Sequence, residues 1–199
     1  MPDVARPTGK EVCTTAKEII MTAATDIANE RLRKRFARWD QNSNGTLEQA
    51  DFEKEAAQIA RAFGKSADSA EAQALHAAFA GMFRHLAVEA GAGADGMLSE
   101  EDFVRVTQKL MFQDGEEAFN TVLGPVMRSI VGLCDKNADG QINADEFVAW
   151  LGAVGVDSTQ AADAFRQVDT NGNGELSIEE LLEAVRNFHF GRLEVELLG

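Results

Sequence analysis

The sequence predicts an all-α fold in which four helix–loop–helix units are arranged in two pairs and form one compact domain. Residues 135–146 and 169–180 have the same order of oxygen-bearing side chains with a glycine in the sixth place, and residues 40–51 and 91–102 repeat parts of that order. Apolar residues on both sides of each segment recur at intervals of three or four, as on one face of a helix. The repeat therefore predicts four loops, each entered and left by a helix.

The eighth place of every loop is apolar, and its side chain is expected to point away from the centre of the loop. The four residues at this place are Leu47, Leu98, Ile142 and Leu176. We expect Leu47 to pair with Leu98 and Ile142 to pair with Leu176. Each pairing would form a short two-stranded β link between two loops.

The loops at 135–146 and 169–180 fit the EF-hand pattern of Ca²⁺-binding loops at every place. Ca²⁺ takes 6 to 8 oxygen ligands at roughly 2.3–2.6 Å, so one short loop has to wrap the ion from several sides. Gly140 permits the sharp turn because glycine has no Cβ. The expected ligands are the side chains of Asp135, Asn137, Asp139, Glu146, Asp169, Asn171, Asn173 and Glu180, and the backbone carbonyls of Gln141 and Glu175.

The first loop has two carboxylates and two asparagines in its ligand places: Asp40, Asn42, Asn44 and Asp51. Its closing residue, Asp51, is one methylene shorter than the glutamates that close the loops at 135–146 and 169–180. A shorter side chain reaches the ion less fully, which weakens the preference for Ca²⁺ over Mg²⁺. We therefore expect three Ca²⁺ sites, of which the first loop is the least selective and the most open to competition by Mg²⁺.

The loops divide the chain into two EF-hand pairs, at residues 23–112 and 116–199. The loop at 91–102 has glycine in its first and third places, so two side-chain ligands are missing, and we expect it to keep the fold but to bind metal poorly. Residues 1–22 contain two prolines and mixed polar residues, and we expect this extension to be partly disordered. The tail at 189–199 is apolar, so we expect it to fold back onto the domain.

Composition excludes several classes of partner. The net charge of −14 and the pI of about 4.6 argue against binding to nucleic acid or to anionic membranes. We interpret the basic run Arg31, Arg33, Lys34 and Arg35 as the solvated face of an amphipathic helix. No segment has the apolar length of a signal peptide or a membrane span, so we expect a cytoplasmic protein.

The chain resembles the sarcoplasmic calcium-binding proteins, most closely their bacterial member. The resemblance rests on ANERLRKRFARWD, CDKNADGQINADEF, QVDTNGNGELS and the ending FHFGRLEVELLG. It implies active first, third and fourth loops in a cytosolic Ca²⁺ buffer or carrier. Its ligand positions match Asp40, Asn42, Asn44, Thr46 and Asp51, then Asp135, Asn137, Asp139, Gln141 and Glu146, then Asp169, Asn171, Asn173, Glu175 and Glu180.

Two other functions compete with a buffer. A Ca²⁺ sensor that exposes a Met-rich groove to an unknown protein partner is the alternative, but only Met82, Met111 and Met127 lie on the predicted helices of the repeat region.

The third class is the coelenterazine-using photoproteins, which also have four such units and three active loops. The chain has no tyrosine and only three histidines, and it offers no nucleophile with an adjacent base. We therefore expect a monomeric Ca²⁺-binding protein that is not an enzyme.

Overall fold

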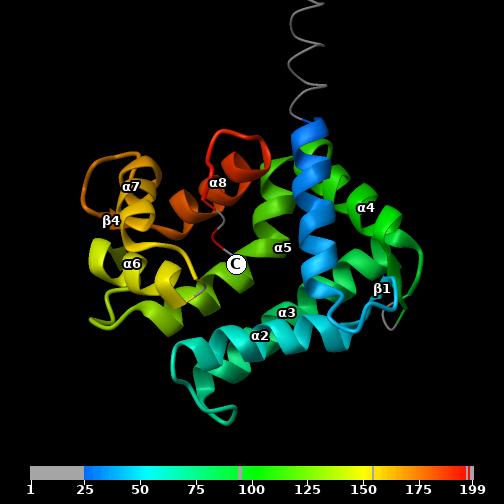
Figure 1. Ribbon diagram of the computed structural model, residues 1–199, viewed down its shortest axis with the longest axis horizontal. Coiled ribbons are helices and arrows are strands. Elements are labelled where there is room, and N and C mark those ends of the chain that lie inside the picture. Colours follow the sequence, from blue (N-terminus) through cyan, green and yellow to red (C-terminus); the bar gives the residue numbers. More distant parts are fainter. Residues whose placement is uncertain (1–24, 94–95, 154, 196, 198–199) are drawn as a thin grey trace, which may run out of the picture.

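Helices carry nearly all of the regular structure, as the spacing of the apolar residues predicts (Figure 1). The computed structural model describes residues 25–93, 96–153, 155–195 and 197. The N-terminal extension, which the sequence predicts to be partly disordered, lies outside the described residues. Within the described part of the chain, no helix combines the length and the apolar character needed to cross a membrane.

The elements follow the order of the four predicted loops. Residues 25–39 are helical and lead to β1 (Thr46–Leu47), α2 (Gln49–Ala62), α3 (Ala70–Ala90), β2 (Leu98–Ser99) and α4 (Glu100–Phe112). The second half contains α5 (Gly115–Cys134), β3 (Ile142–Asn143), α6 (Ala144–Ala153), α7 (Ser158–Val168), β4 (Glu175–Leu176) and α8 (Ile178–His189). Each loop therefore contains a two-residue strand within its seventh to ninth places, and the outgoing helix begins within two residues of that strand.

Both predicted β links are present and antiparallel. Leu47 pairs with Leu98 in the first half, and Ile142 pairs with Leu176 in the second half. All four side chains are fully buried. The eighth-place residues therefore join the loops in pairs and also begin the hydrophobic core.

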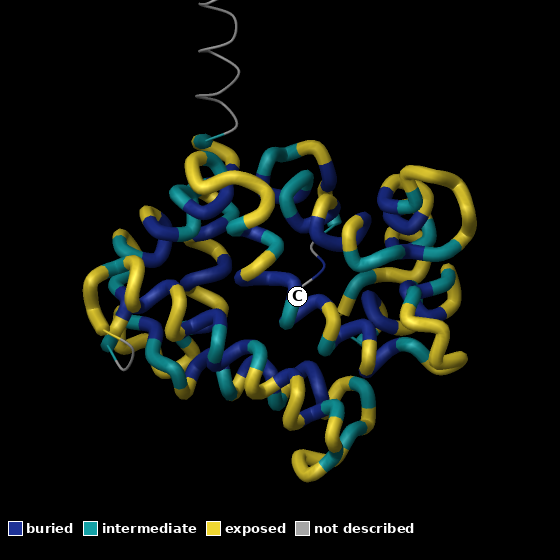
Figure 2. The backbone as a smooth tube through the Cα atoms, turned by 180° about the vertical axis from the view of Figure 1, so that it is seen from behind, coloured by how far each residue is buried: buried dark blue, intermediate teal, exposed yellow. Residues whose placement is uncertain are grey.

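The two halves share one continuous hydrophobic core, which confirms the prediction of a single all-α domain. In the first half, Trp39 packs edge-on against Phe52 with ring centroids 4.7 Å apart. In the second half, Phe147 packs in the same manner on Trp150 at 5.7 Å. Helix α5 joins the halves because it contacts α3 and α4 on one side and α8 on the other. Figure 2 shows buried backbone along the inward sides of the helices, while the loops at the rim are largely exposed.

The C-terminal tail folds back onto the first helix, as predicted. Leu193 and Leu197 are buried. Arg31 holds this segment, because its Nη1 donates to the backbone carbonyl of Leu193 at 2.8 Å and to that of Phe188. Its guanidinium also lies 4.1 Å from the centroid of the Phe188 ring, a cation–π distance. One side chain from the start of the domain thus fastens its end.

The interpretation of the basic run as a solvated face is wrong for two of its four residues. Arg31 contacts the tail, and Arg35 is only 6% exposed. Burial lowers the pKa of Arg35 to about 10, an effect that the charge of nearby Glu55 opposes. Burial likewise raises the pKa of Glu55, and Arg35 and Arg38 counteract it. The first helix therefore contributes a buried charge pair to the core, since opposite charges offset part of each other's desolvation.

Replacing Arg31 with methionine should lower the free energy of unfolding by about 1.5–3 kcal/mol, the contribution of hydrogen bonds made by a charged donor. The matched control is Arg33→Met, because Arg33 is exposed and makes a surface ion pair with Glu100 at 3.3 Å. That pair should contribute less than about 1 kcal/mol. Urea denaturation of both variants at saturating Ca²⁺ measures the difference, and equal midpoints would contradict the role given to Arg31.

Candidate metal-binding loops

The loops at 40–51, 135–146 and 169–180 curl in the same way. In each, the carboxylate of the first residue accepts a hydrogen bond from the N–H of the sixth-place glycine. The N···O distances are 2.9 Å for Asp40 and Gly45, 2.8 Å for Asp135 and Gly140, and 3.0 Å for Asp169 and Gly174. The three glycines have φ values of 80°, 83° and 84°, a region that is unstrained only for glycine. The glycine thus lets the backbone turn around the first carboxylate.

The fifth-place side chains continue this curl. Their Oδ1 atoms accept the N–H of the seventh residue: Asn44 from Thr46 at 2.9 Å, Asp139 from Gln141 at 2.9 Å, and Asn173 from Glu175 at 2.8 Å. The third-place asparagines accept the N–H of the fifth residue in the same fashion. The structure therefore turns the predicted side-chain ligands toward the backbone of their own loops, so that each set of donors lies together.

The closing glutamates of the third and fourth loops fold back over the start of the loop. Glu146 Oε1 accepts the N–H of Lys136 at 2.8 Å, and Glu180 Oε1 accepts the N–H of Thr170 at 3.1 Å. Burial alone would raise the pKa of Glu180. Hydrogen bonds from Ser177, Thr170 and Asn171 outweigh this effect, and the pKa is lowered. Each carboxylate thus stays close to the first ligands of its loop, and Glu180 is held ionised.

The closing aspartate of the first loop is held differently. Asp51 is only 1% exposed; its Oδ2 accepts the N–H of Glu48 at 3.0 Å, and its Oδ1 lies 3.1 Å from Lys54 Nζ. Both partners belong to the start of α2, whereas the glutamates also contact the second residue of their loops. Asp51 therefore caps its helix and pairs with a cation instead of reaching back across the loop.

Asp102, at the twelfth place of the second loop, follows the pattern of Asp51. Its carboxylate accepts hydrogen bonds from Ser99 Oγ at 2.7 Å and from Arg105 at 2.6 Å, and Ser99 Oγ caps α4. The loop begins with Gly91, which ends α3 in the left-handed conformation. These roles are structural, which agrees with the expectation that this loop keeps the fold.

Lys54 belongs to a pattern that is visible in the sequence but is not part of the EF-hand ligand pattern. A cation stands three residues after each closing aspartate of the first pair, at Lys54 and Arg105, and the equivalent places of the second pair hold Ala149 and Glu183. On a helix, residues three apart lie side by side, so a cation there pairs with the closing carboxylate.

The donor sets fit a hard cation that accepts mixed oxygen ligands. Among the described residues, no group of three or more His, Cys, Asp or Glu side chains is placed to hold a metal ion. The loops therefore depend on amide and carbonyl oxygens to complete a coordination shell, which suits Ca²⁺ or Mg²⁺ and does not suit Zn²⁺. In the second pair, Gln141 Nε2 donates to Glu175 Oε2 at 2.7 Å and so connects the seventh places of the two loops.

Comparison with known proteins gives consistent matches. The EF-hand family model matches residues 134–151 and 161–185. Calerythrin from Saccharopolyspora erythraea is 66% identical over 175 residues, which are 88% of this chain and 99% of that protein. The luciferin-binding protein of Renilla reniformis is 31% identical over 170 residues, with 84% and 88% of the two chains covered.

Among solved structures, a Streptomyces coelicolor calcium-binding protein that mediates prokaryotic calcium-dependent regulation superposes with a TM-score of 0.65 and 26% identity. The superposition covers 82% of this chain and 98% of that one.

Proposed function

The chain belongs to the EF-hand calcium-binding proteins of the calerythrin type, and we propose that it binds three Ca²⁺ ions as a monomeric cytoplasmic buffer or transporter. The three sites are the loops at 40–51, 135–146 and 169–180. The observation that carries the proposal is the shared curl of these loops, in which the first-place carboxylate meets the N–H of the sixth-place glycine. The second loop shares neither the ligands nor the curl and is left out.

Counting bound Ca²⁺ by isothermal titration tests the three sites. The wild-type chain should bind three ions, and Asp40→Asn, Glu146→Gln and Glu180→Gln should each bind two, because each removes a ligand carboxylate with little change in volume. Asp102→Asn is the matched control and should still bind three ions. A loss of one ion in this control, or none in the other variants, would contradict the assignment.

The first loop is the place where Mg²⁺ should compete best. Its closing carboxylate is short and already paired with Lys54, so a metal ion has to displace an ammonium group to gain this ligand. Mg²⁺ prefers six ligands and keeps several of its water molecules. Its affinity therefore falls less than that of Ca²⁺ when the twelfth-place carboxylate supplies one oxygen or none.

Asp51→Glu should raise the ratio of Ca²⁺ to Mg²⁺ affinity in the first loop by about tenfold, which corresponds to ~1.4 kcal/mol. The longer side chain can reach back toward Gln41, as Glu146 reaches Lys136. Competition titrations of Ca²⁺ against Mg²⁺ measure the ratio, with Asp102→Glu as the control that should not change it. An unchanged ratio in Asp51→Glu would show that the length of this side chain does not set selectivity.

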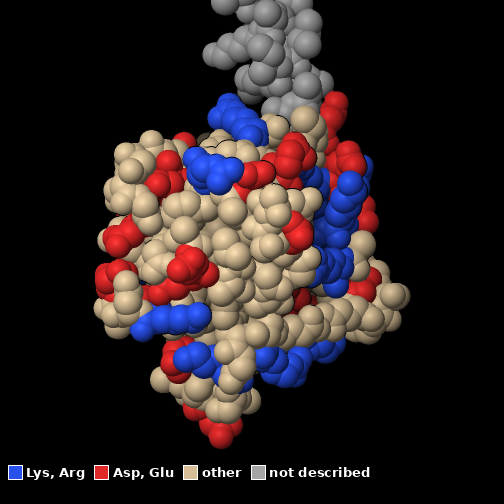
Figure 3. All heavy atoms as spheres, turned by 60° about the vertical axis from the view of Figure 1, so that its left-hand side comes forward, with Lys and Arg blue, Asp and Glu red and all other residues tan. Residues whose placement is uncertain are grey.

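Several features support a buffer over a sensor. Met82, Met111 and Met127 are all buried, so they do not form an exposed docking groove. Among the described residues the exposed large hydrophobic side chains are Ile27, Val88 and Met97, which lie on separate elements. On the face seen in Figure 3, acidic side chains form several separate clusters with Lys and Arg between them. On this face the acidic side chains therefore form no single patch for a basic protein partner.

The alternative is a Ca²⁺ sensor that exposes an apolar surface to a protein partner. It is favoured by the Streptomyces coelicolor structure, which is described as mediating calcium-dependent regulation.

Luciferin binding, which the name of the Renilla reniformis relative states, is not part of the proposal. The internal cavity of about 60 Å³ is smaller than the roughly 150 Å³ that holds a single benzene ring.

Binding of 8-anilinonaphthalene-1-sulfonate, with and without Ca²⁺ at fixed Mg²⁺, separates buffer from sensor. Dye fluorescence should fall when Ca²⁺ is added, because the ions neutralise clustered carboxylates and tighten the apolar core. The double variant Glu146→Gln with Glu180→Gln is the control and should show a smaller fall. A rise in fluorescence would contradict the buffer and favour the sensor.

A further inference from the structure

One contact between the two loops of the second pair is made by side chains and not by the backbone of the β link. Gln141 Nε2 donates a hydrogen bond to Glu175 Oε2 with an N···O distance of 2.7 Å. Both residues hold the seventh place of their loops, where the backbone carbonyl is the proposed ligand and the side chain is not. The contact therefore joins two residues that belong to two different metal sites.

The register of the link explains why these two side chains meet. Asn143 pairs with Glu175, so Gln141, two residues before Asn143, is a diagonal neighbour of Glu175 across the antiparallel strands. Side chains alternate between the two faces of such a pair, and Ile142 and Leu176 take the face that is buried in the core. Gln141 and Glu175 therefore share the outer face, where long side chains reach a diagonal neighbour.

The first pair has the same arrangement without a charge. Its seventh-place residues are Thr46 and Met97, and they are diagonal neighbours across the link between β1 and β2. Thr46 Oγ1 lies 3.8 Å from Met97 Sδ, a contact between a hydroxyl group and a weak acceptor. Both pairs thus bring their seventh-place side chains together, but the second pair places a carboxylate there.

The carboxylate of Glu175 lies beside both loops of its pair, because its partner Gln141 belongs to the other loop. The charge around an EF-hand loop sets its affinity for Ca²⁺, and a divalent ion is attracted twice as strongly as a monovalent one. The amide of Gln141 is neutral, so it positions this charge without cancelling it. In the first loop, by contrast, the ammonium group of Lys54 lies 3.1 Å from the carboxylate of Asp51 and offsets its charge.

We propose, on the basis of the Ca²⁺ sites assigned above, that Glu175 serves both loops of the second pair. Its backbone carbonyl is a ligand of the loop at 169–180, while its side chain raises the Ca²⁺ affinity of the loop at 135–146 through its negative charge. Gln141 is the positioning residue that holds this charge on the outer face of the link.

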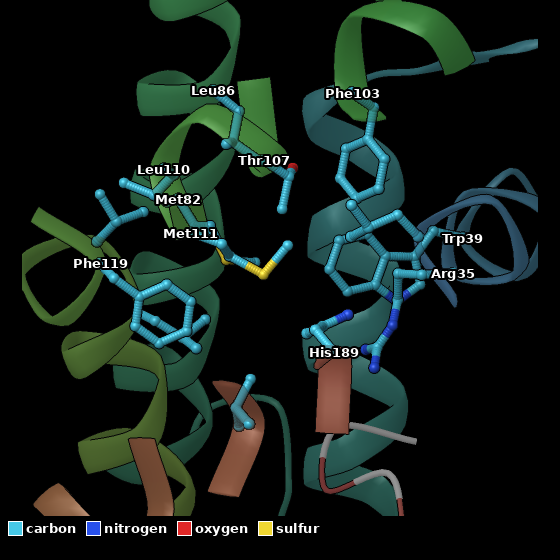
Figure 4. Close-up of a pocket in the computed structure, with 14 residues that line it drawn as sticks. Arg35, Trp39, Met82, Leu86, Phe103, Thr107, Leu110, Met111, Phe119 and His189 are labelled. Carbon is cyan, nitrogen blue, oxygen red and sulfur yellow. The ribbon is translucent and has the colours of Figure 1, made fainter. Parts of the chain in front are cut away.

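Substitutions at these two positions leave the core untouched. Gln141 and Glu175 are only half-buried. Figure 4 shows the core cavity, which lies between Trp39 and Phe103 on one side and Phe119 on the other. Its lining comes from the helix at 25–39 and from α3, α4, α5 and α8, and none of the lining residues belongs to a loop. Changes in Ca²⁺ affinity therefore report on the contact between the loops and not on a loosened core.

The test measures the loop at 135–146 alone, in the full chain with Glu180→Gln, which disables the neighbouring loop. The ¹⁵N-labelled amide of Gly140 follows a titration with Ca²⁺, since its N–H donates to Asp135. In this background Glu175→Gln should weaken binding by about three- to tenfold, because the charge is lost while the new amide can still pair with Gln141.

Glu179→Gln is the matched control for the loss of a carboxylate. Glu179 is exposed in the first turn of α8, one residue from the end of the loop at 169–180. Its substitution removes the same charge from the chain but leaves the outer face of the link intact. It should change the affinity of the loop at 135–146 by less than about twofold, since charges in water are screened.

Gln141→Met keeps the length of the side chain and removes the N–H donor, so Glu175 loses its tether. This substitution alone should weaken Ca²⁺ binding to the loop at 135–146 by about two- to fivefold, the contribution of a hydrogen bond that positions a charge. Combined with Glu175→Gln it should add little, because both substitutions remove the same effect. A double-mutant cycle over these variants measures the departure from additivity.

Three results would overturn the proposal. Equal effects of Glu175→Gln and Glu179→Gln would mean that Glu175 acts only through the net charge of the chain. Additive effects of Glu175→Gln and Gln141→Met would refute the positioning role of Gln141. A Gly140 signal that does not respond to Ca²⁺ would refute the metal site at 135–146 itself, so a failure of the proposed function is distinguishable from a failure of the bridge.

Discussion

The pairing of the loops through their eighth-place residues is the constraint on which the rest of the fold depends. Leu47 with Leu98 and Ile142 with Leu176 place two loops back to back, and their buried side chains begin the core. The outgoing helices α2, α4, α6 and α8 each begin within two residues of such a link, so the link sets where these helices start. The shared core follows, because helices that diverge from two fixed points can bury their apolar faces only against each other.

This constraint explains why the second loop persists without its ligands. The loop at 91–102 has lost its first and third donors, yet Leu98 still pairs with Leu47, and Ser99 with Asp102 still begins α4. Loss of the link would expose the buried eighth-place side chain of the partner loop, whereas loss of metal-ligand side chains leaves this buried pair intact. The fold and metal binding therefore depend on different places of the same loop.

The sequence predicts what depends on local spacing and misses what depends on distant partners. The loops, the links and the buried tail follow from periodicity and from the EF-hand pattern. For Arg35, charge predicts exposure and spacing predicts burial, and the structure agrees with spacing. It lies three residues after Leu32 and four before Trp39, so helical periodicity already puts it on the buried face. Its partner Glu55 and the contacts of Arg31 with residues 188–194 depend on tertiary packing, which no local pattern contains.

Arg31 ties the first helix to the last one. It donates to the backbone carbonyl of Phe188 in the last turn of α8 and to that of Leu193 after the helix. The first helix and the segment after α8 are thus joined by polar contacts beside an apolar interior. Hydrogen bonds of this kind are directional, and their polar groups are costly to leave unpaired. They therefore favour one register of the first helix, that is, one position along its axis. Apolar packing alone would tolerate several registers, and the contacts of Arg31 with residues 188–194 therefore help to give the two halves a defined relative position.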